Sequence, residues 1–139
     1  MIDARTAPYA ATLLRVSLGL LFLAHAGLKL FVFTPSGTAQ FFQSLGLPGT
    51  AAYLVILAEL AGGIALVAGI YARLVAPALI PILLGAIITV HGPAGFFFDN
   101  AGGGWEFLAL WISGLMAVAL LGDGVYALRP TSLTRATLR

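Results

Sequence analysis

The chain has 139 residues, of which 60% are hydrophobic and only 9% are charged, and its mean hydropathy is +1.04. A soluble domain carries about 25% charged residues, and a chain of this length cannot bury so much apolar surface. The composition excludes an ordinary soluble domain and indicates an integral membrane protein in contact with the lipid bilayer. The net charge of +2 is too small and too scattered to indicate nucleic-acid binding. The absence of cysteine from the sequence excludes disulfides and cysteine nucleophiles.

Four apolar stretches are long enough to cross a bilayer, which needs about 20 residues per helix. They cover residues 10–33, 51–71, 74–91 and 105–126. Turn-rich segments connect them, with TPSGT and GLPGT framing the first and GPAGFFFDNAGGG forming the third. The sequence therefore predicts one all-α domain over residues 1–139, an integral membrane four-helix bundle.

Basic residues in short connections predict the orientation, because Lys and Arg there stay on the cytoplasmic side of the membrane. In the topology above, the N-terminus, the second connection and the C-terminal tail lie on one side, and they carry Arg5, Arg73, Arg129, Arg135 and Arg139. We therefore expect both termini to be cytoplasmic.

The first stretch has a competing interpretation as a signal peptide. A secretory signal peptide has basic residues, then a short apolar run, then a cleavage site between small residues, and the sequence up to Ala24-His25-Ala26 has this pattern. The apolar run continues through Phe33, however, which favours a membrane span.

Three ionisable residues of the first stretch share one helix face. At about 100° per residue, Lys29 lies roughly 40° from Arg15, and His25 lies another 40° further round. Gly19 and Phe22 lie near the same stripe, so we expect this face to point inward, because a charge facing lipid is costly.

The helical rise of about 1.5 Å per residue gives the depth of these groups. By this estimate His25 and Glu59 lie roughly 12 Å below the outer membrane surface and Lys29 lies about 6 Å below it. His91 and Glu106 lie at the rim of the bundle, above these three residues. We predict a Lys29–Glu59 ion pair with His25 as a shared hydrogen-bond partner, in a polar pocket in the outer half of the bundle. The alternative is a pair that only locks two helices together.

Other polar and aromatic residues receive separate predictions. Snorkelling to the inner headgroups explains Arg15. Trp105, beside Glu106, is the one tryptophan expected at the site, whereas Trp111 fits an aromatic belt at the membrane interface. No metal site is predicted, because the histidines and carboxylates lack spacings such as HxxxH or ExxH.

Together these segments resemble the DoxX family of small four-helix membrane proteins. The resemblance spans nearly the whole chain and rests on Arg15 with Gly19, HAGLK, FFQSLGLP, Glu59 with AGG, AGIYARLVA, GGGWE and Gly122 to Gly124. It implies a bacterial or archaeal inner-membrane protein. The matching polar positions are Arg15, Lys29, Glu59, Arg73, Trp105 and Glu106.

Members of the family are similar to the membrane subunit of thiosulfate:quinone oxidoreductase, which implies a quinone-linked accessory subunit within a larger complex or oligomer. Phe22, Phe97 and Trp105 are the expected apolar walls of a quinone site, with His25, Lys29, Glu59 and His91 as its polar groups. No motif for a covalently bound cofactor is present in the sequence, so a redox partner protein would supply electrons. The alternatives are a non-enzymatic scaffold or assembly subunit and a small-molecule or proton carrier.

Overall fold

The computed structural model describes residues 3–131, and these residues are predominantly helical. Their helical elements, including two π-helical turns, are α1 (Ala7–Gly27), η1 (Leu28–Val32), α2 (Pro35–Ser44), α3 (Gly49–Ala68), α4 (Ala72–Ala86), η2 (Ile87–His91) and α5 (Glu106–Leu121). Three helical stretches are long and apolar enough to cross a membrane: Ala7–Val32, Gly49–Ala68 and Ala72–His91. The all-α, multi-pass membrane assignment is therefore confirmed. Arg135 and Arg139 lie outside the described residues.

The expected count of four helices is not confirmed, because the first predicted connection contains α2. Pro35 occupies the first turn of α2, and the Thr34 side chain accepts a hydrogen bond from the Gly37 N–H at 3.2 Å. A capping threonine followed by proline is a helix start signal, although the same residues are also typical of turns. The helix ends at Ser44, shortly before Gly46 with its positive φ of 79°.

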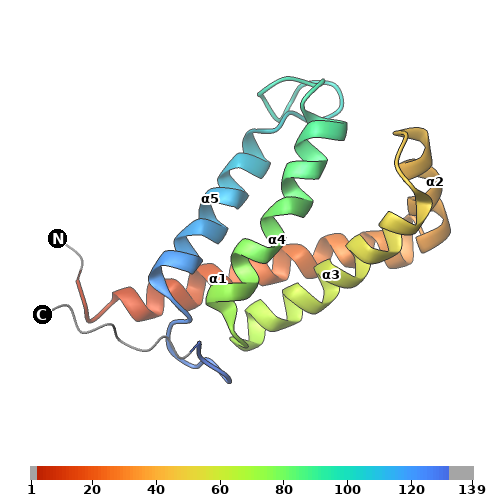
Figure 1. Cartoon of the computed structure of the whole chain (residues 1–139). Coiled ribbons are helices and arrows are strands. Elements are labelled where there is room, and N and C mark those ends of the chain that lie inside the picture. The colour runs from red at the N-terminus through yellow and green to blue at the C-terminus, as the bar shows by residue number, and fades with distance from the viewer. Residues whose placement is uncertain (1–2, 132–139) are drawn as a thin grey trace, which may run out of the picture.

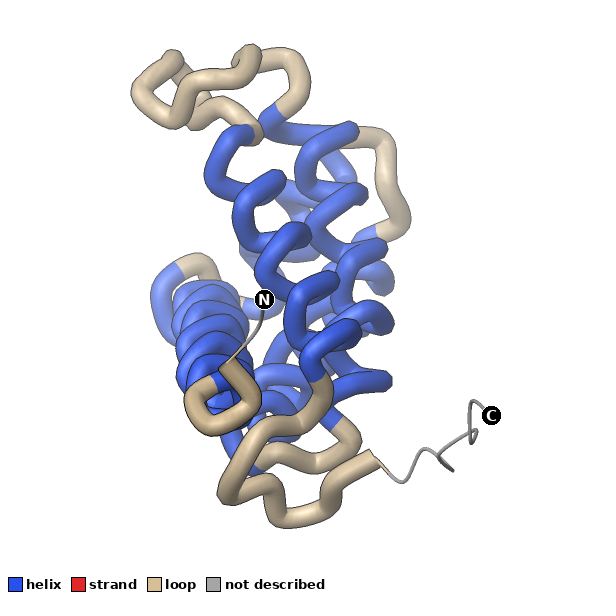
Figure 2. Tube along the Cα trace, turned by 90° about the vertical axis from the view of Figure 1, so that its left-hand side faces the viewer, coloured by secondary structure: helices blue, strands red, loops and turns tan. Residues whose placement is uncertain are grey.

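The long helices form two antiparallel pairs that meet at one end and diverge at the other (Figure 1). One pair is α1 with α3, and the second is α4 with α5. Viewed from the side, α1 is seen nearly end-on while the second pair rises away from it (Figure 2). We call the end where α1 begins and α3 meets α4 the closed end. The open end carries α2 on one pair and residues 92–105 on the other.

Close backbone contacts hold the helices together between these two ends. A Cβ added to Gly19 of α1 would lie 2.9 Å from the carbonyl oxygen of Gly63 in α3, so only glycine permits this approach. The absence of a side chain at Gly62 of α3 likewise makes room for the side chain of Leu79 in α4. The remaining core is apolar and includes Leu18, Phe22, Leu66, Leu83, Leu108, Trp111, Leu115 and Val118.

Arg15 lies at the centre of the closed end and does not reach the membrane surface. Its side chain is 1% exposed, and it donates to the carbonyl oxygens of Leu66 (2.8 Å), Val67 (2.7 Å), Asp123 (2.8 Å) and Val125 (3.1 Å). The predicted snorkelling is therefore wrong. The last carbonyls of α3 have no partner within their own helix, and a buried guanidinium supplies donors and positive charge there.

Arg73 binds the end of α5 in a similar way. Its Nε donates to the Ala119 carbonyl at 2.8 Å and its Nη2 to the Leu120 carbonyl at 3.0 Å. Its backbone N–H donates to Asp123 Oδ1 at 3.1 Å. Both arginines thus stabilise the closed end through bonds to backbone carbonyls.

The connection between the two helix pairs is a short elbow, which we define as Gly69 to Tyr71. Gly69 has φ 69° and Tyr71 has φ 46°, so two of its three residues are left-handed. The left-handed conformation costs a residue other than glycine about 1–2 kcal/mol. The Tyr71 N–H donates to the Arg129 carbonyl at 2.8 Å, which ties the elbow to the segment that follows α5.

We predict that Arg15→Met lowers the free energy of unfolding by about 3 kcal/mol or more, because four carbonyls lose a charged donor at once and two of them, those of Leu66 and Val125, keep only a neutral one. Arg15→Lys should recover only part of this loss, since an ammonium has three donors and no planar fork. Reversible unfolding in detergent micelles measures the change. Leu13→Met is the matched control, because Leu13 lies on the same helix and is 71% exposed. Equal stability of Arg15→Met and the control would contradict the proposed role of Arg15.

Candidate functional site

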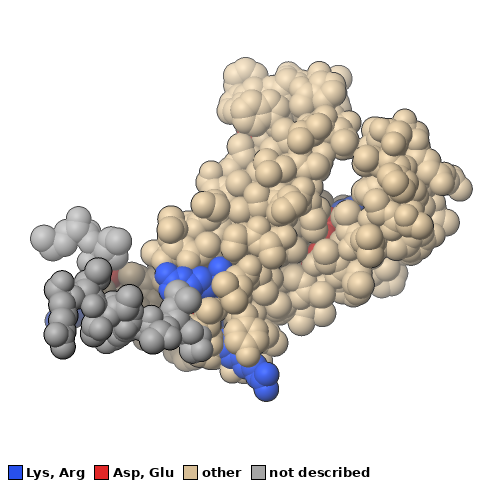
Figure 3. Space-filling model, in the orientation of Figure 1, with Lys and Arg blue, Asp and Glu red and all other residues tan. Residues whose placement is uncertain are grey.

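A cavity of about 1110 Å³ lies between the diverging helix pairs. It is lined by residues of both pairs, of α2 and of the segment before α5, and most of them are apolar. The space-filling view shows an opening between α2 and the loop above α4 and α5, with a basic and an acidic patch at its floor (Figure 3). We call this cavity the cleft.

Lys29 and Glu59 line the cleft as an ion pair, which confirms the pairing predicted from helical spacing. Lys29 Nζ donates to both carboxylate oxygens of Glu59, at 2.8 and 2.7 Å. The Glu59 side chain is 5% exposed and that of Lys29 is 19% exposed. Lys29 lies in η1, where the first membrane helix changes to π-helical geometry, whereas Glu59 lies within α3.

His25 lines the same cleft but does not share the ion pair. Its Nδ1 donates to the Leu21 carbonyl on its own helix at 3.0 Å, because a carbonyl oxygen can only accept. Its ring centroid lies 5.0 Å from that of Trp111 in an edge-on arrangement. The predicted role of His25 as a hydrogen-bond partner of the pair is therefore wrong, although its side chain does line the cavity.

His91 and Glu106 also line the cleft, where both contact the loop before α5. His91 Nδ1 donates to the Gly103 carbonyl at 2.7 Å, and Glu106 Oε1 accepts from the Phe98 N–H at 2.9 Å. His91 is the last residue of η2 and Glu106 the first of α5. Both therefore lie beside the loop between η2 and α5, which they help to order.

The structure exchanges the roles predicted for the two tryptophans. Trp105 does not line the cleft and packs edge-on against Phe96, with ring centroids 4.8 Å apart. Trp111 is 4% exposed, lines the cleft and packs against Phe22, with ring centroids 4.7 Å apart. Trp105 precedes the first residue of α5, whereas Trp111 lies within the helix, and a window of apolar residues alone does not indicate which side of a helix is inward.

Two further aromatic predictions are wrong. Phe22 is fully buried in the core rather than in the wall of the cleft, and Phe97 is 60% exposed. The aromatic walls come instead from Phe41 and Phe42 of α2 and from Phe107 of α5. The two residues of α2 were missed because that segment was interpreted as a connection; its Thr34-Pro35 start was the available signal.

The floor of the cleft favours a neutral ligand with polar atoms, whereas Glu106 adds a carboxylate at the side of the loop before α5. Lys29 is neutralised by Glu59, so the floor carries no net charge to attract an anionic headgroup. A smaller apolar cavity of about 370 Å³, lined by Lys29, Phe33, Phe41 and Phe42 among others, adjoins this floor and lies next to α2. Among the described residues, no group of three or more potential metal ligands occurs.

We predict that the Lys29–Glu59 pair shows strong coupling in a double-mutant cycle. Lys29→Met or Glu59→Met alone leaves an unpaired ionisable group, whereas the double variant replaces both by apolar side chains. The double variant should therefore be more stable than additivity predicts, with a coupling energy of about 2 kcal/mol or more. Unfolding in detergent micelles measures all four proteins. Additive losses would show that the pair contributes nothing beyond its separate side chains.

Comparison with known proteins agrees with this architecture. The model of the family described as DoxX matches residues 10–92. A protein of Bacillus subtilis (strain 168) named "Putative oxidoreductase CatD" is 40% identical over 118 residues, which cover 85% of this chain and 83% of that protein. No solved structure matches the chain significantly. On the family match and this relative, the chain belongs to the DoxX family.

Proposed function

We propose that this DoxX-family protein is the membrane subunit of an oxidoreductase system and binds a lipophilic quinone in the cleft. The observation that carries the proposal is the cleft itself, which combines apolar and aromatic walls with a neutralised ion pair and two histidines. A quinone likewise combines polar and apolar parts, because its polar oxygens lie on an apolar ring that carries a hydrocarbon chain. The word oxidoreductase in the name of the 40% identical relative supports a redox role.

The dimensions of the cleft support a ligand of this size. Pockets for small molecules commonly measure about 300–1,000 Å³ and are mostly apolar, with a few polar groups that orient the ligand. A cavity of about 1110 Å³ has room for a quinone ring and the first part of its chain. The adjoining cavity beside α2 would extend the apolar path for the remaining chain.

Electron transfer in this proposal depends on a partner protein. The sequence has no cysteine, so thiolate ligands and redox-active thiols must come from elsewhere in the complex. The role of this subunit is to bind the quinone, exclude water from it and hold polar groups near its oxygens.

The orientation proposed for the inner membrane places the closed end at the cytoplasm and the open end at the outer face, with α5 as the fourth crossing. The α5 helix has 16 residues, so the apolar residues that precede and follow it would complete the span. Arg15 and Arg73 lie at the closed end, in agreement with the excess of basic residues expected on the cytoplasmic side.

We predict that alkaline phosphatase fused after Ser44 is active and that the same enzyme fused after Tyr71 is inactive, because alkaline phosphatase folds only outside the cytoplasm. Green fluorescent protein at the same two positions should give the reverse pattern. Measuring both reporters in whole cells decides the orientation. An inverted pattern would overturn the proposed topology without affecting the cleft.

Filling the cleft should abolish quinone binding. A Cβ at Gly85 meets no atom within 4 Å, and Gly85 lines the cleft, so we expect Gly85→Phe to occupy the ligand volume. Affinity for decylubiquinone should fall roughly tenfold or more, measured by quenching of tryptophan fluorescence in nanodiscs. Gly27→Phe is the matched control, because Gly27 is also helical and unobstructed but does not line the cleft. Equal affinity of the two variants would refute binding in the cleft.

A non-enzymatic scaffold is the second candidate, and the bidentate ion pair favours it. Both oxygens of Glu59 accept from Lys29, so the pair also serves to join the first membrane helix to α3. A scaffold role predicts that Glu59→Gln lowers protein stability and recovery of the complex in parallel. Loss of activity in a fully assembled complex would instead favour the quinone site.

A further inference from the structure

In their neutral form the two histidines of the cleft share one tautomer, because Nδ1 of each is bonded to a backbone carbonyl. Nδ1 of His25 donates to Leu21 and Nδ1 of His91 donates to Gly103. In a neutral imidazole with its proton on Nδ1, Nε2 keeps a lone pair and can only accept. Within residues 3–131, neither Nε2 atom has a hydrogen-bond partner.

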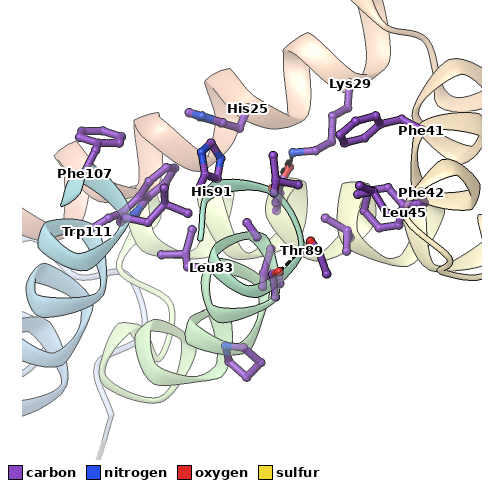
Figure 4. A pocket seen from close by; sticks show the side chains of 18 of the residues that line it. His25, Lys29, Phe41, Phe42, Leu45, Leu83, Thr89, His91, Phe107 and Trp111 are labelled. Carbon is purple, nitrogen blue, oxygen red and sulfur yellow. Dashed lines mark hydrogen bonds and ion pairs between the residues drawn. The ribbon is translucent and has the colours of Figure 1, made fainter. Parts of the chain in front are cut away.

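Both histidines lie at the same part of the cleft, although they come from different helix pairs. His25 belongs to α1 and His91 ends η2. The close-up shows them near Trp111 and Phe107, while Lys29 lies at the opposite side beside Phe41 and Phe42 (Figure 4). Two acceptors on separate elements therefore flank one region of an otherwise apolar cavity.

The other polar side chains of the cleft provide few free donors. The Thr89 hydroxyl donates to the Gly85 carbonyl at 2.8 Å, and Lys29 uses two of its three N–H groups on Glu59. Trp111 Nε1 has no partner in the described chain, but it is covered by neighbouring atoms and is not on the surface of the cleft. Among the described side chains that line the cleft, several acceptors therefore face one remaining exposed donor, the third N–H of Lys29.

We propose that the cleft binds the reduced, hydroxyl-bearing form of its ligand, a quinol, more tightly than the oxidised quinone. This inference rests on the proposed quinone site. The oxygens of a quinone only accept hydrogen bonds, so the lone pairs of the two histidines find no donor on it. The two hydroxyl groups of a quinol can donate one hydrogen bond each to these nitrogens. An unpaired acceptor in an apolar cavity is costly, so the difference favours the quinol.

The experiment compares the two forms of one probe on the full chain. The protein is placed in phosphatidylcholine nanodiscs under anaerobic conditions, and decylubiquinone is titrated while tryptophan fluorescence is recorded. The affinity of decylubiquinol is obtained from its displacement of the quinone. We expect the quinol to bind roughly tenfold more tightly, as two neutral hydrogen bonds would provide.

Paired substitutions connect this preference to the histidines. The variant His25→Asn/His91→Asn places an amide nitrogen near each Nδ1 position, which preserves the donation to the backbone carbonyl, and removes both Nε2 acceptors. The ratio of the two dissociation constants should then fall to about one. His25→Gln/His91→Gln is the control, because a longer amide can place its oxygen near the Nε2 position and should restore part of the preference.

The outcomes separate the two proposals. If neither form binds, or if Gly85→Phe does not affect binding, the quinone site itself is rejected. If both forms bind in the cleft with equal affinity, or if the quinone binds more tightly, the site stands and the preference for the quinol is overturned. The wild-type ratio decides this even if a histidine variant does not fold. A preference that persists in the double asparagine variant would overturn the role of the histidines.

Discussion

The hydrogen bonds of Arg15 hold together the end of the molecule on which the rest of the structure depends. One guanidinium joins α1 to the last carbonyls of α3 and to the segment after α5. Burying this charge is costly, and the cost is offset because all its bonds are to carbonyls, including those with no partner in their own helix. The two helix pairs therefore stay in contact at the closed end while they diverge towards the open end, and their divergence creates the cleft.

The polar groups of the cleft lie where regular helical structure ends or changes. Lys29 and His91 belong to the π-helical turns η1 and η2, which end the first membrane helix and α4. Such turns are frequent at functional sites, because they alter the direction of side chains relative to an α-helix. Glu59 is the exception, since it lies within α3 and its charge is compensated by Lys29. The site is thus built between two pairs of helices, with most of its polar side chains near their open end.

Sequence reasoning located the ion pair because helical spacing and rise are almost invariant. Lys29 and Glu59 could be assigned a face and a depth from residue numbers alone, and the structure joins them. The same reasoning placed Arg15 on the inward face, where it is buried, but did not identify its partners, because they are backbone carbonyls that have no sequence signature. It failed for Trp111 and α2. An evenly apolar helix does not indicate its inward face, and a short amphipathic helix after a proline resembles a connection.

The elbow of Gly69 to Tyr71 determines how the cleft can change shape. It has too few residues to lengthen, and its left-handed conformation is fixed by pairing with Arg129. The helix pairs are also in contact through Gly62 and Leu79 a short distance away. Because the helix pairs are joined here and separate towards α2 and residues 92–105, a rotation at this joint would change the width of the open end more than that of the closed end.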